Sequence, residues 1–358
     1  MARIEIHNRI STTFMPVLID RGPLGVRLFA PTEQGRGKKP PEFRPEDSTC
    51  IELGVLNNMG DLALEQTERQ ISQLLDAAAS NLVVLLRFYS LPDLQRGEWG
   101  QRHLKRMRYY DVDDLWDHRL DGLIVTGAEP RTAELKMESY WRTLTEVFDW
   151  AENNTISTIS SCLAVHAAVL YFDGINRQPL DQKCFGVFSF ERVSNDHLVN
   201  GLPPRFEMPH SRWNEIPEDP LISAGYDILV RADRYGVDTF VKRKRSLFVF
   251  FQGHPEYEAW TLFGEYRRDI VRFLAGELKP YPEMPHGYFD QESTRILDAF
   301  RAKALNNPHT ELMAAFPSDQ LARKLPHTWR TVAAKTYDNW LKYVAALKAE
   351  RAGRIVRF

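Results

Sequence analysis

"STISSCLAVHAAVLYF", residues 157–172, joins a β-prone run to an alanine-rich helical pattern, and Cys162 lies at the junction. Packing alone does not require a thiol there. In an open parallel sheet, ligands and chemistry collect where strands end at their carboxyl side and loops turn into helices. A helix N-terminus offers N–H groups and a partial positive charge, which stabilise both a thiolate and an oxyanion. The position favours a nucleophilic cysteine, with a buried structural cysteine as the alternative.

The segments around this stretch alternate between strand-like and helix-like patterns. This alternation predicts an α/β fold, a doubly wound and mostly parallel sheet with helices on both faces. After Gly174 the patterns favour an antiparallel or mixed extension of the sheet, including a hairpin that turns near Tyr235 and Gly236. Expected strands are 50–56, 82–89, 121–129, 155–161, 185–193, 226–243 and 247–256, and expected helices are 64–79, 139–152, 163–172, 258–277, 291–305 and 328–352.

Three regions are expected along the chain. Residues 30–48 are rich in proline, glycine and charge, so residues 1–48 are interpreted as an N-terminal arm. Residues 49–282 are predicted to form the main domain. Residues 283–358 are predicted to be a C-terminal helical extension that packs on the same domain.

Composition excludes several classes of function. The 46 basic and 48 acidic residues give a net charge of −2 and are well mixed, so no nucleic-acid partner is expected. No run of about 18 apolar residues occurs and the N-terminus does not resemble a signal peptide, so we expect a cytoplasmic protein without membrane contact. The three cysteines are far apart, which predicts neither a disulfide framework nor a metal site. The acidic residues 110–118 are interpreted as a capped helix start rather than a metal site.

A candidate base follows the apolar strand 247–251 in "FVFFQGHPEYE". The spacing of His254 and Glu256 places both side chains on one side of an extended segment, so the carboxylate can orient the imidazole. Taken alone, this triplet is more often an ordinary turn, but together with Cys162 it indicates a catalytic set. His166, one helical turn after Cys162, is a rival base; its alternative role is that of a histidine near the site.

Several motifs, in this order and spacing, resemble the homoserine O-succinyltransferase family of homoserine O-acyltransferases. The resemblance covers about residues 50–282 and resumes at the last helix. Its motifs are "DGLIVTGA" (121–128), "YW" (140–141), "CLAVHAAV" (162–169), "DGINRQPLDQKCFGVF" (173–188), "PHSRW" (209–213), "GHPEY" (253–257) and "TLFGEYRRD" (261–269).

The resemblance implies a fold like that of class I glutamine amidotransferases and a role in methionine biosynthesis. It implies ping-pong transfer of an acyl group from acyl-CoA, a co-substrate, to a hydroxy amino acid, with no bound cofactor, in a homodimer. Cys162 would carry the acyl group as a thioester, His254 would be the general base and Glu256 its orienting partner. The substrate-binding residues that it implies are Lys183, Ser211 and Arg268, whose alternatives are a solvated lysine, a capping serine and a surface ion pair.

Some positions depart from the family pattern. Leu163 and His166 stand where members usually have Trp and Gln. Arg131 falls at a position linked to the choice of acyl chain, and we expect it to favour an acyl chain with a carboxylate, such as succinyl, over acetyl; the alternative is that it points to solvent. These departures leave open a relative that acylates another acceptor. A glutamine amidotransferase-like hydrolase and a non-enzymatic relative are further alternatives.

Overall fold

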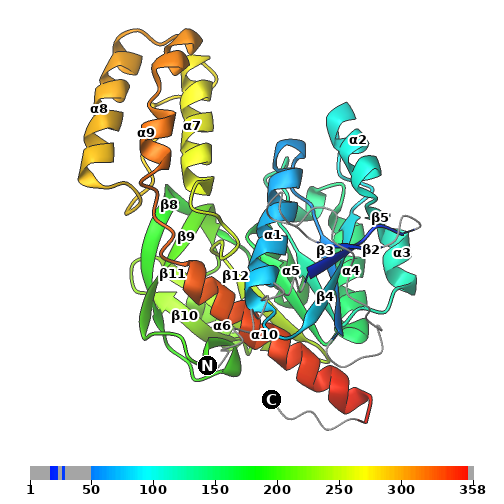
Figure 1. The fold of residues 1–358 in the computed structure, drawn as a ribbon. Helices are drawn as coiled ribbons and strands as arrows, with labels where there is room; N and C mark the ends of the chain where they lie inside the picture. Colours follow the sequence, from blue (N-terminus) through cyan, green and yellow to red (C-terminus); the bar gives the residue numbers. More distant parts are fainter. Residues whose placement is uncertain (1–16, 23–25, 29–49, 354–358) are drawn as a thin grey trace, which may run out of the picture.

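The computed structural model describes residues 17–22, 26–28 and 50–353, and these residues form one twelve-stranded sheet between layers of helices (Figure 1). The strand order is β2-β1-β4-β3-β6-β7-β12-β11-β10-β8-β9, and β5 pairs with β4 outside this path. The strands are β1 Val17–Asp20, β2 Val26–Leu28, β3 Cys50–Leu56, β4 Val83–Ser90, β5 Tyr110–Asp111, β6 Gly122–Val125, β7 Ser157–Ser161, β8 Gln178–Arg192, β9 Arg205–Glu215, β10 Asp227–Ala232, β11 Gly236–Arg243 and β12 Leu247–Phe251.

The centre of the sheet is parallel and the strands after Gly174 extend it largely in the antiparallel sense. β1, β4, β3, β6, β7 and β12 run parallel to one another in this order. β2 pairs with β1, and β11, β10, β8 and β9 continue from β12, by antiparallel pairings. The predicted α/β class, the parallel centre and the mixed extension are therefore confirmed. β7 and β12 are adjacent, with Ser161 beside Phe251, although 85 or more residues separate them along the chain.

The described residues form ten α-helices, α1 Leu64–Ala78, α2 Glu98–Met107, α3 Val112–Asp117, α4 Trp141–Asn154, α5 Leu163–Asp173, α6 Glu218–Ser223, α7 Thr261–Leu274, α8 Gln291–Asn306, α9 Ser318–Ala322 and α10 Arg330–Arg351. The six predicted helices correspond to α1, α4, α5, α7, α8 and α10, which begin and end within three residues of their predicted positions. No helix range was predicted for α2, α6 or α9. Short 3-10 helices occupy Asp61–Ala63, Leu135–Met137, His197–Val199 and Thr310–Ala315.

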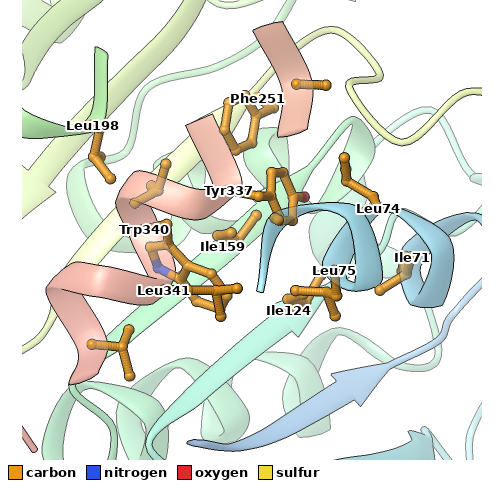
Figure 2. Close-up of a cluster of buried hydrophobic side chains, with 14 of the residues drawn as sticks. Ile71, Leu74, Leu75, Ile124, Ile159, Leu198, Phe251, Tyr337, Trp340 and Leu341 are labelled. Atoms are coloured by element: carbon orange, nitrogen blue, oxygen red, sulfur yellow. The ribbon is translucent and has the colours of Figure 1, made fainter. Parts of the chain in front are cut away.

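α1 and α10 cover one face of the sheet. Figure 2 shows Leu74 and Leu75 of α1 and Trp340 and Leu341 of α10 meeting over the strands. The Trp340 indole N–H donates to Ser157 Oγ at 2.9 Å, so this fully buried ring has its polar atom satisfied. Burying side chains of this size contributes about 1.5–3 kcal/mol each, which fixes α10 on the sheet.

The other face of the sheet packs against α3, α4, α5 and α6. The acidic residues 110–118 form the predicted capped helix start, because the Asp111 N–H donates to Asp114 Oδ2 at 3.0 Å at the beginning of α3. In α5, alanines 164, 167 and 168 are buried, which allows this helix to lie close to the strands.

α7, α8 and α9 stand together at one end of the molecule, beyond β8 and β9 (Figure 1). They share a separate apolar cluster that includes Phe185 of β8 and the buried Trp329, after which α10 returns to the sheet. Within the described residues no helix is both long enough and apolar enough to cross a membrane.

The first 48 residues contribute more than an arm. β1 pairs in parallel with β4, and β2 pairs with β1, so this segment supplies strands at the edge of the sheet. The apolar residues Val17 and Leu18 are fully buried there, which explains why they join the sheet. The proline- and glycine-rich residues 30–48 lie outside the described residues, and the predicted boundaries at 49 and 283 stay predictions.

Candidate active site

Cys162 lies at a sharp turn between β7 and α5. Its backbone has φ 54° and ψ −118°, which is a rare conformation for a residue with a side chain. Such strain costs about 1–3 kcal/mol and is concentrated at functional sites. The Cys162 N–H donates to the Phe251 carbonyl at 2.9 Å, which ties the turn to the end of β12. This geometry is that of a nucleophile elbow, which lifts the thiol to the carboxyl edge of the sheet.

The loop after β6 passes directly against this elbow. A Cβ atom on Gly127 would lie 2.9 Å from the Leu163 backbone nitrogen, so no larger residue fits without moving the turn. Thr126, which precedes it, donates its hydroxyl to the Leu56 carbonyl at 3.4 Å and accepts from the Asn58 N–H at 2.8 Å. The glycine in the "TGA" motif is therefore required by close approach of two backbones.

His254 and Glu256 lie beside Cys162 because β12 ends next to β7. His254 Nδ1 is 2.8 Å from Glu256 Oε1, and the two side chains are only 8% and 13% exposed. Glu256 and Cys162 both lie close enough to the imidazole to raise the pKa of His254. When His254 Nδ1 donates to the Glu256 carboxylate, Nε2 is the nitrogen left to face the sulfur. Cys162 can then act as nucleophile, His254 as base and Glu256 as the carboxylate that orients the base.

The charge of His254 depends on its neighbours. Burial lowers its pKa, but the Glu256 carboxylate and then Cys162 raise it, and the balance holds the pKa of His254 well above its usual value. His254 is therefore positioned both to accept a proton from a nucleophile and to hold it for a leaving group. Its ring also stacks on Tyr257, with centroids 4.1 Å apart.

The rival base, His166, lies in a different environment. It is buried, and burial is the main cause that lowers its pKa to about 3, with further contributions from Arg177 and Arg212. A group with so low a pKa accepts protons poorly at neutral pH. Gln252, which opposes this lowering, accepts from the Ile216 N–H at 2.9 Å. The burial of His166 fits a structural histidine behind the elbow.

A second pair of buried polar residues supports the segment that carries His254. His210 Nε2 lies 3.1 Å from Asp238 Oδ1, and neither residue is exposed. The Gly253 N–H donates to the same carboxylate oxygen at 3.2 Å. A Cβ atom on Gly253 would lie 2.6 Å from Asp238 Oδ1 and 2.8 Å from His210 Nε2. This pair thus fixes the path of the chain immediately before His254.

Ser211 belongs to a polar cluster that begins at Tyr257. The Tyr257 hydroxyl donates to Glu265 Oε1 at 2.6 Å, and the Ser211 hydroxyl donates to Glu265 Oε2 at 2.6 Å. Because Tyr257 stacks on His254, the cluster adjoins the candidate catalytic residues. Burial is the main cause that raises the pKa of the Tyr257 hydroxyl, and Glu265 raises it further. Cys162 and Glu256 also raise this pKa, which fits the position of Tyr257 beside the candidate catalytic residues.

Lys183 and Arg268 complete this cluster. Lys183 Nζ is 3.8 Å from Glu265 Oε2 and 3.9 Å from Asp269 Oδ2, and it lies 4.0 Å from the centre of the Phe185 ring. Burial lowers the pKa of Lys183, although the two carboxylates oppose this effect. The Arg268 guanidinium donates to Asp269 Oδ1 at 2.9 Å, and its side chain is 55% exposed. Cations and carboxylates together suit a zwitterionic ligand.

Arg131 lies away from this cluster. It is exposed, its guanidinium donates to the Gln95 side chain, and its backbone N–H donates to Glu138 Oε1 at 2.7 Å. Glu138 also accepts from the Thr132 N–H at 2.7 Å, so a buried carboxylate holds the loop in shape. The expectation that Arg131 selects the acyl chain stays a prediction.

Sequence reasoning missed three members of the cluster. Tyr257, Glu265 and Asp269 all fall inside the quoted motifs "GHPEY" and "TLFGEYRRD", but none was singled out. A usable signal was present, because Glu265 and Asp269 are spaced four apart on α7 and so lie on one helix face. Among the described residues no group of histidine, cysteine and carboxylate side chains is arranged to hold a metal ion.

Comparisons with known proteins place these motifs in a family. The profile of the family described as Homoserine O-succinyltransferase matches residues 40–351. A homoserine O-succinyltransferase of Rhodopseudomonas palustris is 45% identical over 333 residues, which are 93% of this chain and 99% of that protein. One of Bradyrhizobium japonicum is 44% identical over 304 residues, 84% of this chain and 92% of that protein.

A solved structure with some likeness is a glutamine amidotransferase of Thermotoga maritima. It has a TM-score of 0.42 and 12% identity, and covers 82% of this chain and 98% of its own. Family membership rests on the sequence matches, which extend over nearly the whole chain. The matched residues 40–351 include the turn at Cys162 and the end of β12 that precedes His254. The chain belongs to the homoserine O-succinyltransferase family, a family of acyltransferase enzymes.

Proposed function

We propose that this enzyme moves a succinyl group from succinyl-CoA to the hydroxyl of homoserine through a thioester on Cys162. The observation that carries the proposal is the placement of Cys162 at a strained elbow beside the His254–Glu256 pair. The names of the related proteins support succinyl as the acyl group and homoserine as the acceptor. Methionine-type amino-acid biosynthesis is the corresponding role.

In the first half-reaction the Cys162 thiol gives its proton to His254, and the sulfur attacks the thioester carbonyl of the donor. The new carbon–sulfur bond forms as the carbonyl becomes an oxyanion. In this mechanism the donor that stabilises the oxyanion is the N–H of Leu163, the first residue of α5. A donor of this kind is worth about 3 kcal/mol in the transition state. When the oxyanion collapses, the bond to the coenzyme A sulfur breaks, and the His254 imidazolium supplies the proton that this thiolate takes.

In the second half-reaction the acceptor hydroxyl attacks the thioester on Cys162. His254 takes the hydroxyl proton as the new carbon–oxygen bond forms, and the Cys162 sulfur leaves. Lys183 and Arg268 supply cations for the acceptor carboxylate, and Ser211 supplies a hydroxyl in the same cluster. Neither half-reaction needs a bound cofactor. We also propose a homodimer, which sedimentation of the purified protein tests.

Isotope exchange tests the two-step mechanism. If the acyl group passes through Cys162, the enzyme must exchange labelled coenzyme A into succinyl-CoA without any acceptor present. Exchange that appears only when homoserine is added would contradict the proposal. A panel of hydroxylated amino acids then identifies the acceptor: discharge by another amino acid but not by homoserine would indicate a different substrate. Ammonia release from glutamine without acyl transfer would indicate the hydrolase alternative.

A further inference from the structure

Helix α2 carries a group of basic side chains that the proposed mechanism does not use. Within residues 102–108 four residues are basic and none is acidic: Arg102, Lys105, Arg106 and Arg108. All four are exposed, and among the described residues only Arg102 of this group pairs with a carboxylate, that of Glu98 at 3.1 Å. The whole chain has a net charge of −2, so this positive charge is local to α2. Such a group attracts a ligand with several negative charges.

An exposed indole ring lies beside one of these cations. Trp99 is 42% exposed, and its ring stacks on that of His103, with centroids 5.0 Å apart and an angle of 15° between the rings. The Arg106 guanidinium donates from Nη2 to His103 Nδ1 at 3.1 Å. Because both side chains contact the same imidazole, the indole and the guanidinium lie next to each other on α2. An aromatic ring beside cations is the combination that binds a nucleotide base and its phosphates.

Buried groups hold this imidazole in place. His103 is buried, and its Nε2 lies 2.6 Å from Oε1 of Glu68, a buried residue of α1. The same carboxylate oxygen accepts from the Tyr109 hydroxyl at 2.8 Å. When His103 Nε2 donates to Glu68, Nδ1 can accept from Arg106, so one fixed ring positions both the guanidinium and the indole. The indole and one cation are therefore preorganised, unlike the side chains of an ordinary solvated helix face.

α2 stands at the edge of the sheet that carries Cys162. It follows the carboxyl end of β4, and Figure 1 shows it rising from the sheet on the same side as α7, which follows β12. β3 and β6 lie between β4 and β7, so the ends of β4 and β7 are about 14 Å apart. A ligand that reaches from Cys162 to α2 must therefore be long.

The loops between α2 and Cys162 are tied to one another. Arg96, which lies just before α2, donates from its guanidinium to the Met59 carbonyl at 2.9 Å, in the loop after β3. In the same loop the Asn58 N–H donates to Thr126 Oγ1 at 2.8 Å. Thr126 belongs to the loop after β6 that packs against the turn at Cys162. A continuous series of contacts thus connects the start of α2 with the elbow.

We propose that Trp99 and Arg106, with the other exposed cations of α2, bind the 3′-phosphorylated ADP portion of coenzyme A while the thioester of the donor lies at Cys162. This inference rests on the proposed acyl transfer from succinyl-CoA. The adenine stacks on the indole, and the cations bind the phosphates. The pantetheine arm, a long chain between the nucleotide and the thioester, spans the distance from α2 to the elbow.

The test compares two donors that differ in the nucleotide. Succinyl-CoA carries it, whereas the thioester of succinate with N-acetylcysteamine has the same reacting group and lacks the nucleotide. For Trp99→Ala and for Arg106→Gln we expect kcat/KM for succinyl-CoA to fall about tenfold, whereas that for the short donor changes less than about twofold. Trp99→Phe and Arg106→Lys should recover part of the loss. The matched control is Arg245→Gln, an exposed arginine before β12, at the amino end of the parallel strands.

A second measurement uses the nucleotide alone. Adenosine 3′,5′-bisphosphate should inhibit the unmodified enzyme competitively with succinyl-CoA, and its inhibition constant should rise about tenfold in Arg106→Gln. Inhibition that is not competitive with succinyl-CoA would assign the surface to a free nucleotide and would overturn the inference.

The comparison of donors has further outcomes that decide the matter. An equal loss with both donors would assign Trp99 and Arg106 to the fold of the enzyme and would overturn the inference, as would an unchanged kcat/KM for succinyl-CoA in both variants. Failure of both donors to acylate Cys162 in the unmodified enzyme would instead refute the proposed function itself.

Discussion

Glu256→Gln separates the charge of the orienting residue from its position. Glutamine has nearly the same shape and keeps an oxygen that accepts from His254 Nδ1, so the imidazole should keep its tautomer and its direction toward Cys162. The substitution removes the negative charge that lies 2.8 Å from His254 Nδ1. The perturbation therefore tests whether that charge sets the protonation of His254.

The size of the effect follows from the burial and the contact. Both side chains are mostly buried, at 8% and 13% exposure, so solvent screens the pair only weakly. An adjacent carboxylate favours the imidazolium by about 1–3 pKa units, which corresponds to about 1.4–4 kcal/mol. Removing the negative charge destabilises the charged ring, so the pKa of His254 should fall by that amount.

The assay is the pH dependence of kcat/KM for succinyl-CoA, together with direct titration of the His254 ring by NMR. We expect the His254 midpoint to move to lower pH in Glu256→Gln. Glu256→Ala should move it similarly and should also lower the maximal rate further, because the ring loses its orienting acceptor. A midpoint that is unchanged in Glu256→Gln would refute the reasoning.

Two other predictions concern the residues behind the site. Gly253→Ala forces a Cβ atom against the buried Asp238 and His210, so we expect the free energy of unfolding to fall by about 1–3 kcal/mol and kcat to fall as well. Urea denaturation and turnover assays measure the two effects. Unaltered stability would contradict the close contact. His166, with a folded pKa of about 3 against about 6.5 when unfolded, lets the unfolded chain bind more protons between these values, so stability falls as pH is lowered through that window. His166→Gln should reduce the loss between pH 7 and pH 4.5 by about 3 kcal/mol; an equal loss in both proteins would refute this.

The alternation of apolar runs and amphipathic segments was sufficient to predict most of the sheet. The strands Cys50–Leu56 and Leu247–Phe251 and the helix after Cys162 begin within a few residues of their predicted positions. The elbow followed from the abrupt change from a strand pattern to alanines at Cys162. The neighbouring position of His254 followed from parallel strand ends sharing one edge of a sheet.

Features that depend on long-range pairing could not be predicted in this way. β1 and β2 are short and join the sheet through contacts with β4, so their sequence alone carries little signal. Strand β9, Arg205–Glu215, contains charged residues on its exposed side and was quoted only as the motif "PHSRW". The low pKa of His166 depends on burial, which a sequence pattern does not report.

The central claim is that one sulfur, that of Cys162, carries the acyl group. Cys50 and Cys184 are buried, at 1% and 8% exposure, and burial raises the pKa of Cys184 to about 11. Mass spectrometry of the intact protein tests this claim directly. The protein is exposed briefly to succinyl-CoA, without acceptor, before its mass is measured. We predict a gain of one succinyl group in the unmodified enzyme and in Cys184→Ala, and none in Cys162→Ala. Acylation that persists in Cys162→Ala, or that never appears in the unmodified enzyme, would contradict the account.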